Sequence, residues 1–373
     1  MLMDGLLKLV QRRGRDGSVL LAGLLAAAGV GTIPARAQTV AAKPATAPLV
    51  IDPYFVPIPT GPSSTMPRTI IRNMRQDRAG NIWFATFSGP IRFNGSAFTR
   101  HSEEVGLPDS RIFSVLEARS GSLWFGSVSG GASRYDGKDF KRFTRASGLG
   151  GDSVWCICED RAGRIWFGTD GGATCLDGTA MTTFTAHHGL ADNAVYAIFQ
   201  DAAGKMWFGT QGGVCSFDGK AFAPLHDATG KPFSNVRAMA ADRAGNLWFG
   251  GEGGAFRYDG KAVTTFTPKD GLLDTFVGSM IVDRDGNIWM GHPGGRGAGG
   301  ASRYDGKVFT TFTRAEGLGC DTVYALLEDA SGNIWLGSID AGVWLYDGKA
   351  FTTVSAPLPQ PPDQVAPGVV PGR

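Results

Sequence analysis

Seven tryptophans recur along this 373-residue chain at nearly constant spacing, and this period restricts the fold more than any other feature. They are separated by 41, 42, 41, 41, 41 and 46 residues: Trp83, Trp124, Trp166, Trp207, Trp248, Trp289 and Trp335. A period of about 40 residues is typical of the blades of a β-propeller. Each repeat is then one small unit that buries its apolar surface only against its neighbours.

Each repeat contains four short strand signals separated by regular turns. In the third repeat the signals cover residues 154–157, 164–167, 173–176 and 181–184. A glycine stands three residues before every repeat tryptophan, where a tight first hairpin needs a positive φ. An Asp-Gly or Asn-Gly pair follows in the third hairpin of all seven repeats, such as Asp136-Gly137, and predicts a two-residue type I′ turn.

Runs such as residues 287–290 are apolar on both strand faces, which fits a sheet packed between two others. The 55 glycines and the turn density exclude a helical solenoid. Seven units can close into a ring that leaves only short edges. We therefore predict an all-β fold, a seven-bladed β-propeller of four-stranded antiparallel blades over residues 68–355. Blades one and seven are expected to meet by packing alone, unless residues 49–56 add an edge strand.

The ends of the chain differ from the repeats in composition. Residues 1–37 combine a basic stretch, an apolar run over 19–33 and the sequence Ala35-Arg36-Ala37, which predicts a cleaved signal peptide. An uncleaved membrane anchor is the alternative. Residues 38–67 are an Ala/Pro-rich linker and 356–373 a Pro-rich tail. The expected location is periplasmic or secreted, with no stable membrane span after cleavage.

The charge pattern gives no reason to expect nucleic acid as a partner. The net charge is +2, and residues 1–37 hold five basic and two acidic residues, so the remainder is close to −1. The five cysteines have no metal-ligand spacing and are expected to be small buried residues.

The repeat unit resembles the two-component regulator propeller repeat. The resemblance lies in residues 195–201, in Gly245-Asn246-Leu247-Trp248-Phe249-Gly250, in residues 131–137 and in Gly317-Leu318. It recurs seven times over about three quarters of the chain. It implies a propeller of the kind found in extracytoplasmic sensor domains of hybrid histidine kinases, here as a stand-alone exported propeller without a kinase segment.

Candidate ligand residues are expected on one face of the ring. The loops from second to third strands, and those from one blade to the next, share the face around the channel, which is the default binding site. The variable loop positions, including an unusual insertion at residues 292–300, give these ligand-binding candidates: Phe87, Asp170, Gln211, Glu252, His292, Arg296 and Asp340.

Acidic residues also recur before the inner strands, and they are expected to form local turn hydrogen bonds rather than a cation site. They are Asp109, Asp152, Asp192, Asp274 and Asp321. Zinc, nucleophile-elbow and phosphate-loop motifs are absent from the sequence. The sequence therefore predicts no catalytic residue, no metal and no cofactor.

These observations favour an exported, non-enzymatic propeller that binds or senses a glycan, a peptide or an envelope protein, with a link to two-component signalling implied by the resemblance. One alternative is a metal-assisted lyase resembling streptogramin lyase, for which only Glu252 and His292 could begin a metal site. The other alternative is a structural scaffold of an envelope complex.

Overall fold

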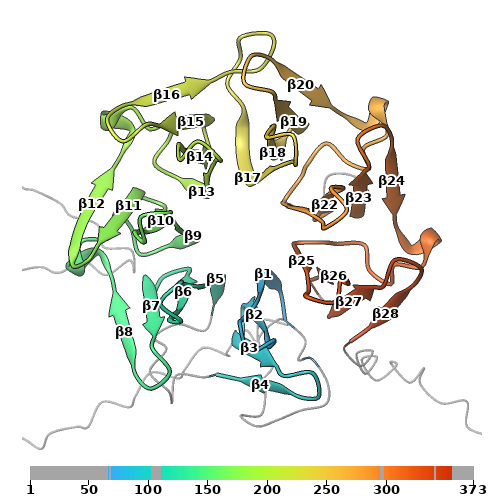
Figure 1. Ribbon diagram of the computed structural model, residues 1–373, viewed down its shortest axis with the longest axis horizontal. Helices are drawn as coiled ribbons and strands as arrows, with labels where there is room; N and C mark the ends of the chain where they lie inside the picture. Colours follow the sequence, from blue (N-terminus) through green and yellow to red (C-terminus); the bar gives the residue numbers. More distant parts are fainter. Residues whose placement is uncertain (1–65, 67–68, 102–110, 295–297, 340–341, 355–373) are drawn as a thin grey trace, which may run out of the picture. The chain divides into compact units, whose positions relative to one another are not determined.

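The propeller is formed by residues within one compact unit, Ile51–Arg373. The computed structural model describes residues 66, 69–101, 111–294, 298–339 and 342–354. These residues form seven four-stranded antiparallel sheets around a central channel (Figure 1). The predicted seven-bladed β-propeller is confirmed. The predicted signal peptide, tail and, apart from Met66, linker lie outside the described residues.

Each blade is a meander whose first strand lies at the channel and whose fourth lies at the rim (Figure 1). The inner strands are β1 (Ile71–Gln76), β5 (Ile112–Glu117), β9 (Val154–Glu159), β13 (Val195–Gln200), β17 (Ser234–Ala241), β21 (Ser279–Val282) and β25 (Ala325–Glu328). The second strands hold the repeat tryptophans and are β2 (Ile82–Thr86), β6 (Leu123–Ser127), β10 (Ile165–Thr169), β14 (Met206–Thr210), β18 (Leu247–Glu252), β22 (Ile288–His292) and β26 (Ile334–Gly337).

The third and fourth strands complete each blade. The third strands are β3 (Gly89–Phe93), β7 (Ala132–Tyr135), β11 (Gly172–Asp177), β15 (Val214–Phe217), β19 (Gly254–Tyr258), β23 (Gly300–Tyr304) and β27 (Val343–Tyr346). The outer strands are β4 (Phe98–Arg100), β8 (Phe140–Phe143), β12 (Ala180–Phe184), β16 (Phe222–Leu225), β20 (Val263–Phe266), β24 (Phe309–Phe312) and β28 (Phe351–Thr353). Short 3₁₀ helices follow four of them: η2 (Arg145–Ser147), η3 (Ala186–His188), η4 (Pro268–Asp270) and η5 (Arg314–Glu316).

The repeat tryptophan joins each blade to the next one. Trp166 is 1% exposed, and its ring lies 5.6 Å from that of Phe208 in the following blade. Trp124 packs in the same way against Phe167, with ring centroids 5.5 Å apart. Such aromatic pairs add stabilisation beyond the area they bury. The hydrophobic core is therefore divided into layers between blades rather than gathered in one centre.

The last blade closes onto the first by the same packing and by two hydrogen bonds. Trp335 lies 6.2 Å from Phe84, and Ile71 packs against Gly337. The Ile71 amide donates to the Ser338 carbonyl at 3.2 Å, and the Ala330 amide donates to Oε1 of Gln76 at 2.7 Å. Among the described residues the two blades share no strand, as expected, but hydrogen bonds at both ends of the inner strand join them in addition to packing. Residues 49–56 lie outside the described ranges.

Aspartate and glycine define the first hairpin of the blades. In six blades an aspartate accepts a hydrogen bond from Nε1 of the repeat tryptophan at 2.8 to 3.0 Å, and Ala118 replaces this aspartate in blade two. Gly80 has a φ of 86°, and the equivalent glycines lie in the same region, as predicted. The aspartate thus fixes both the turn and the tryptophan.

The third hairpin differs from the prediction. Asp136 pairs with Asp139 across the turn, so the central residues are Gly137 and Lys138. Only the glycine has a positive φ, whereas a type I′ turn needs positive φ at both central positions. The Asp136 carboxylate instead accepts the amides of Lys138 and Asp139. The turn is therefore of the type II′ pattern, with aspartate before it rather than within it.

The five cysteines are free thiols, and three of them are buried: Cys175, Cys215 and Cys320. Burial raises the pKa of Cys215 to about 11 and that of Cys158 to about 12. These thiols stay protonated at neutral pH, in keeping with the structural role expected for them.

Replacing Asp283 should destabilise the propeller through the tryptophan that it holds. Asp283→Ala removes the acceptor for Trp289 Nε1 and for the Asn287 side chain, both at 2.8 Å. The expected loss is about 1–3 kcal/mol of unfolding free energy, measured by urea denaturation. Asp285→Ala, at an exposed position in the same turn, should change little and is the control.

Acid should destabilise the propeller through the same carboxylates. Burial raises the pKa of Asp160, Asp242, Asp283 and Asp329, but hydrogen bonds from tryptophan and other groups outweigh it and lower the pKa of each. Their contribution is present above the unfolded pKa of about 4 and is lost as the pH falls through the folded values. The melting temperature should therefore fall below about pH 4, and the difference between wild type and Asp283→Ala should shrink there. A constant difference down to pH 3 would contradict this.

Candidate functional site

One position in every blade faces the central channel at its mouth. It is the residue that follows a buried Ile or Val at the start of each inner strand or within two residues of it. We call these residues the channel-mouth ring, and they are Arg72, Phe113, Trp155, Tyr196, Arg237, Gly278 and Tyr324. All seven are partly exposed, whereas the Ile or Val before each is at most 1% exposed. They line a cavity of about 410 Å³.

A β-bulge turns the ring residue into the channel. In blade one, Ile71 pairs with Thr86 and Asn73 pairs with Ala85, so Arg72 has no cross-strand partner. The same register shift occurs in blades two, three and four. A bulge bends the strand and redirects one side chain. It therefore lets one residue reach the channel while its neighbours remain packed between blades.

Arg72 lies between two aromatic rings. Its guanidinium carbon is 4.6 Å from the Phe113 ring centre and 4.8 Å from the Tyr324 ring centre. Its Nε is buried and has no hydrogen-bond partner among the described residues. Burial and then repulsion from Arg237 lower the pKa of Arg72 to about 10, so it is charged at neutral pH. Stacking holds the Arg72 side chain in place, and its Nε–H group remains able to donate a hydrogen bond.

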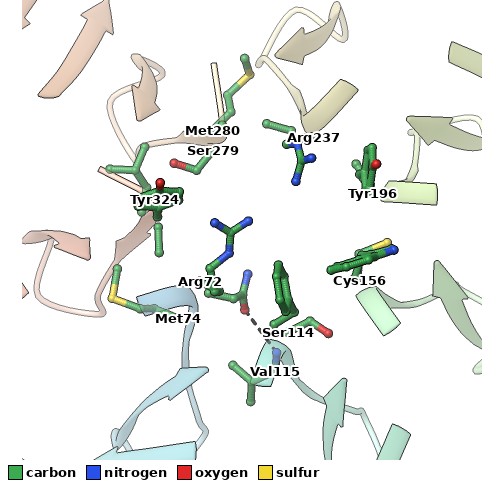
Figure 2. A pocket seen from close by; sticks show the side chains of 18 of the residues that line it. Arg72, Met74, Ser114, Val115, Cys156, Tyr196, Arg237, Ser279, Met280 and Tyr324 are labelled. Carbon is green, nitrogen blue, oxygen red and sulfur yellow. Dashed lines mark hydrogen bonds between the residues drawn. The ribbon is translucent and has the colours of Figure 1, made fainter. Parts of the chain in front are cut away.

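The other side of the ring continues the aromatic contacts. Phe113 meets Trp155 edge to face at 4.7 Å, and Trp155 meets Tyr196 at 6.0 Å. The guanidinium of Arg237 lies 4.2 Å from the centre of the Tyr196 ring. Figure 2 shows Arg72 and Arg237 pointing into the same open space, with Tyr324 and Tyr196 on either side. Six side chains thus form a chain of contacts around the mouth.

The chain of contacts is interrupted at Gly278 in blade six. A Cβ at this position would lie 2.7 Å from Cγ of Pro293, so the residue is restricted to glycine by close approach. The gap opens onto a second cavity of about 230 Å³, which is lined by Arg72, Asn235, Arg237, Glu252, Phe276, Gly278, Pro293, Gly294 and Tyr324. The mouth is therefore asymmetric, with the two arginines on the side of this gap.

Asn235 positions Arg237 and has an uncommon backbone conformation. Its φ is 50°, the only positive value at a non-glycine residue in the part of the chain that is described. Its Oδ1 accepts from Nε of Arg237 at 2.8 Å, and its Nδ2 donates to Oε1 of Glu252 at 3.4 Å. Left-handed conformations of this kind are enriched at binding sites.

Three of the predicted ligand residues lie at this mouth and support the ring. Phe87 packs on Phe113 with ring centroids 5.3 Å apart. Gln211 accepts the Tyr196 hydroxyl at 2.9 Å through Oε1. Glu252 lines the second cavity and raises the pKa of Arg237, although burial, the larger effect, leaves that pKa lowered.

The other predicted ligand residues are placed differently. Oδ1 of Asp170 accepts the Ser153 amide at 3.3 Å, a contact between neighbouring loops. His292 is 0% exposed, and its ring nitrogens lie 2.9 Å from the Phe276 carbonyl and from Oγ of Ser302. This ring is therefore part of the scaffold and offers no nitrogen to a ligand. Arg296 and Asp340 lie outside the described residues.

The aspartates before the inner strands have local partners, as the sequence predicted. Asp152 accepts the Arg145 amide, Asp192 accepts the Ala194 amide, and Asp274 accepts the Phe276 amide. Asp321 pairs with Arg314 at 2.7 Å, while Asp109 is not among the described residues. No group of three or more potential metal ligands occurs in the described ranges.

Sequence reasoning missed the channel-mouth ring because it assigned the inner strands to the scaffold. The available signal is the repeat itself. Aligning the seven units shows that the residue after the first Ile or Val changes from Arg to Phe, Trp, Tyr and Gly. The residue before it is always Ile or Val, and the residue after it is Ala, Ser or Cys except at Asn73. A position that varies between large polar and aromatic types inside a constant strand is the one that faces a channel.

Family comparison agrees with the repeat. The two component regulator propeller model matches six segments: residues 106–129, 148–171, 189–212, 230–253, 271–294 and 317–340. The fold defines a β-propeller with an aromatic and basic channel mouth. Its repeats belong to the two component regulator propeller family. A comparison with curated protein sequences gave no match.

Solved structures share the fold at low sequence identity. The extracellular domain of the putative hybrid two component system BT3049 from B. thetaiotaomicron is 23% identical, with a TM-score of 0.67 over 76% of this chain and 40% of that one. Virginiamycin B lyase from Staphylococcus aureus is 14% identical, with a TM-score of 0.59 over 74% and 94%. PorZ, a surface component of the type-IX secretion system of Porphyromonas gingivalis, is 16% identical, with a TM-score of 0.59 over 75% and 47%.

The chain spans about two fifths of the length of the BT3049 extracellular domain. The helices in the described ranges are single 3₁₀ turns, and none of them could span a lipid bilayer.

Substitution of Asn235 should separate backbone strain from side-chain positioning. Asn235→Ala places alanine, whose side chain has no polar group, at a φ of 50°. This change should lower the unfolding free energy by about 1–2 kcal/mol. Asn235→Gly also removes the bond to Arg237 but avoids this cost. Thermal denaturation should therefore rank wild type and Asn235→Gly above Asn235→Ala. Equal stability of the two variants would show that the backbone is unstrained.

Proposed function

We propose that this chain is an exported ligand-binding propeller of the sensor type, and that its ligand binds at the channel mouth. The observation that supports this most strongly is the channel-mouth ring. Large aromatic and basic side chains occupy six of the seven ring positions, each of them partly exposed at the channel. A scaffold without a ligand has no need for them, since small residues would line the channel at lower cost in desolvation.

The chemistry of the mouth suits recognition of a small polar molecule with a flat or apolar side. Arg72 and Arg237 offer guanidinium donors, and buried Nε1 of Trp155 has no hydrogen-bond partner among the described residues. The rings of Phe113 and Tyr324 supply apolar faces beside them. A few convergent polar groups set among aromatic side chains are characteristic of ligand sites. An oligosaccharide or a short peptide matches this combination.

Export and sensing are supported by two further observations. The N-terminal 37 residues have the composition of a signal peptide, and the solved structure of BT3049 is an extracellular domain of a putative two component system. The match covers 40% of that domain. In this proposal the propeller supplies recognition and a partner supplies the response.

The lyase alternative loses its only candidate site. It required Glu252 and His292 to hold a metal, but the His292 ring is fully buried with both nitrogens bonded inside the scaffold. The scaffold alternative receives no support from a mouth built of exposed aromatic and basic groups.

The proposal is tested by a thermal-shift screen of the full chain against neutral and charged oligosaccharides and short peptides. A ligand present at about 100 times its Kd stabilises the native state by roughly 2.7 kcal/mol, which is a clear rise in Tm. Trp155→Ala should weaken binding of that ligand at least tenfold. Trp155→Phe, which keeps the aromatic ring found in blade two, is the second variant and removes only the Nε1 donor.

The control is Val308→Ala, because Val308 is 60% exposed and lies away from the mouth. It should bind the ligand as wild type does. A ligand that binds Trp155→Ala and wild type equally, or silence across the whole panel, would contradict a binding site at the channel mouth.

A further inference from the structure

The two ring arginines point to the charge of the ligand. We propose that the mouth binds an organic carboxylate, with the carboxylate group between Arg72 and Arg237 and the rest of the molecule against the aromatic rings. The inference rests on the proposed function and specifies its ligand class.

Arg72 differs from the structural arginines of this propeller. Arg119 pairs with Glu159 at 3.2 Å, and Arg284 pairs with Glu328 at 2.6 Å. Arg72 has no acidic partner among the described residues, only aromatic rings and a second arginine. A partly buried cation without a counterion is costly, so its retention is best explained by an anion that arrives from outside.

The charged residues around the second cavity do not cancel one another. Three charged residues line the second cavity: Arg72 and Arg237 are positive, and Glu252 is negative. The sum among these residues is +1, which a single carboxylate neutralises. A doubly charged phosphate would leave an excess negative charge next to Glu252. The site therefore favours a monoanion.

Both guanidinium groups are held in place by contacts within the protein. Stacking between Phe113 and Tyr324 holds the Arg72 guanidinium, and Asn235 and Tyr196 hold that of Arg237. Both guanidinium groups point into the same space in Figure 2. Guanidinium groups bind carboxylates with two parallel hydrogen bonds, and side chains fixed in advance lose less entropy on binding.

Gly278 of blade six lies at the border of the second cavity. Glycine at this position lets Pro293 approach the ring closely, and both residues line the second cavity together with the two arginines. The second cavity thus extends the site past the two guanidinium groups. An organic acid has a body to place in this cavity or against the rings, whereas a simple inorganic ion does not.

The test compares acids with neutral molecules of the same shape. Binding to the full chain is measured by calorimetry for galacturonate and galactose, benzoate and benzyl alcohol, and N-acetylglycine and N-acetylglycinamide. We expect at least one acid to bind tenfold or more tightly than its neutral counterpart. The pair that shows this identifies whether the carboxylate belongs to a sugar, an aromatic acid or a peptide end.

Arg72→Gln and Arg237→Gln should each weaken binding of that acid at least tenfold, while Arg145→Gln, at an exposed outer position, should not. Circular dichroism and Tm establish that each variant folds. Inorganic phosphate and chloride are tested on the same proteins. Binding of these ions alone, or acid binding that survives both substitutions, would overturn the carboxylate site.

The outcomes also separate this inference from the proposed function. If a neutral ligand binds and depends on Trp155, the mouth is a binding site but not for an acid. If neither acids nor the wider panel bind, both proposals fail.

Discussion

The hydrogen bond between the repeat tryptophan and the aspartate six residues before it is the interaction on which the ring depends. One end of the indole is fixed to the first hairpin of its own blade, and its ring packs against the next blade. The same residue therefore sets the shape of a blade and the angle to its neighbour. Because the cost of leaving a buried indole donor unpaired is about that of a lost hydrogen bond, each aspartate stabilises two units at once.

This arrangement explains why the mouth can vary while the ring stays regular. The residues beside each ring position are confined: Ile71 is fully buried, and a Cβ on Gly337 would lie 2.7 Å from its side chain. The bulge leaves Arg72 without a cross-strand partner, and its side chain lies against the rings of Phe113 and Tyr324. Substitutions at such positions change the chemistry of the channel without disturbing the joints between blades. The fold thus separates a constant frame from six variable ring positions, the seventh being confined to glycine by Pro293.

Most of the fold was predictable from the sequence, because spacing and turn chemistry repeat seven times. Gly80 and its equivalents needed positive φ, and they have it. The third turn was predicted wrongly because Asp136 uses its carboxylate to accept two following amides, which a dipeptide preference does not reveal. The site was predicted only in its outer part, through Phe87, Gln211 and Glu252. The bulges that aim Arg72 and Tyr196 inward have no Gly or Pro to mark them, so the inner strands resembled ordinary buried strands.

The missing side chain at Gly278 has a consequence for the molecule as a whole. Seven similar blades each place one residue at the mouth, and identical residues there would let a ligand bind in several equivalent orientations. The different ring residues, together with the gap at Gly278 between Arg237 and Tyr324, remove that equivalence. The propeller therefore has one defined direction across its mouth, and a ligand that recognises it should bind with a stoichiometry of one per chain and in a single orientation.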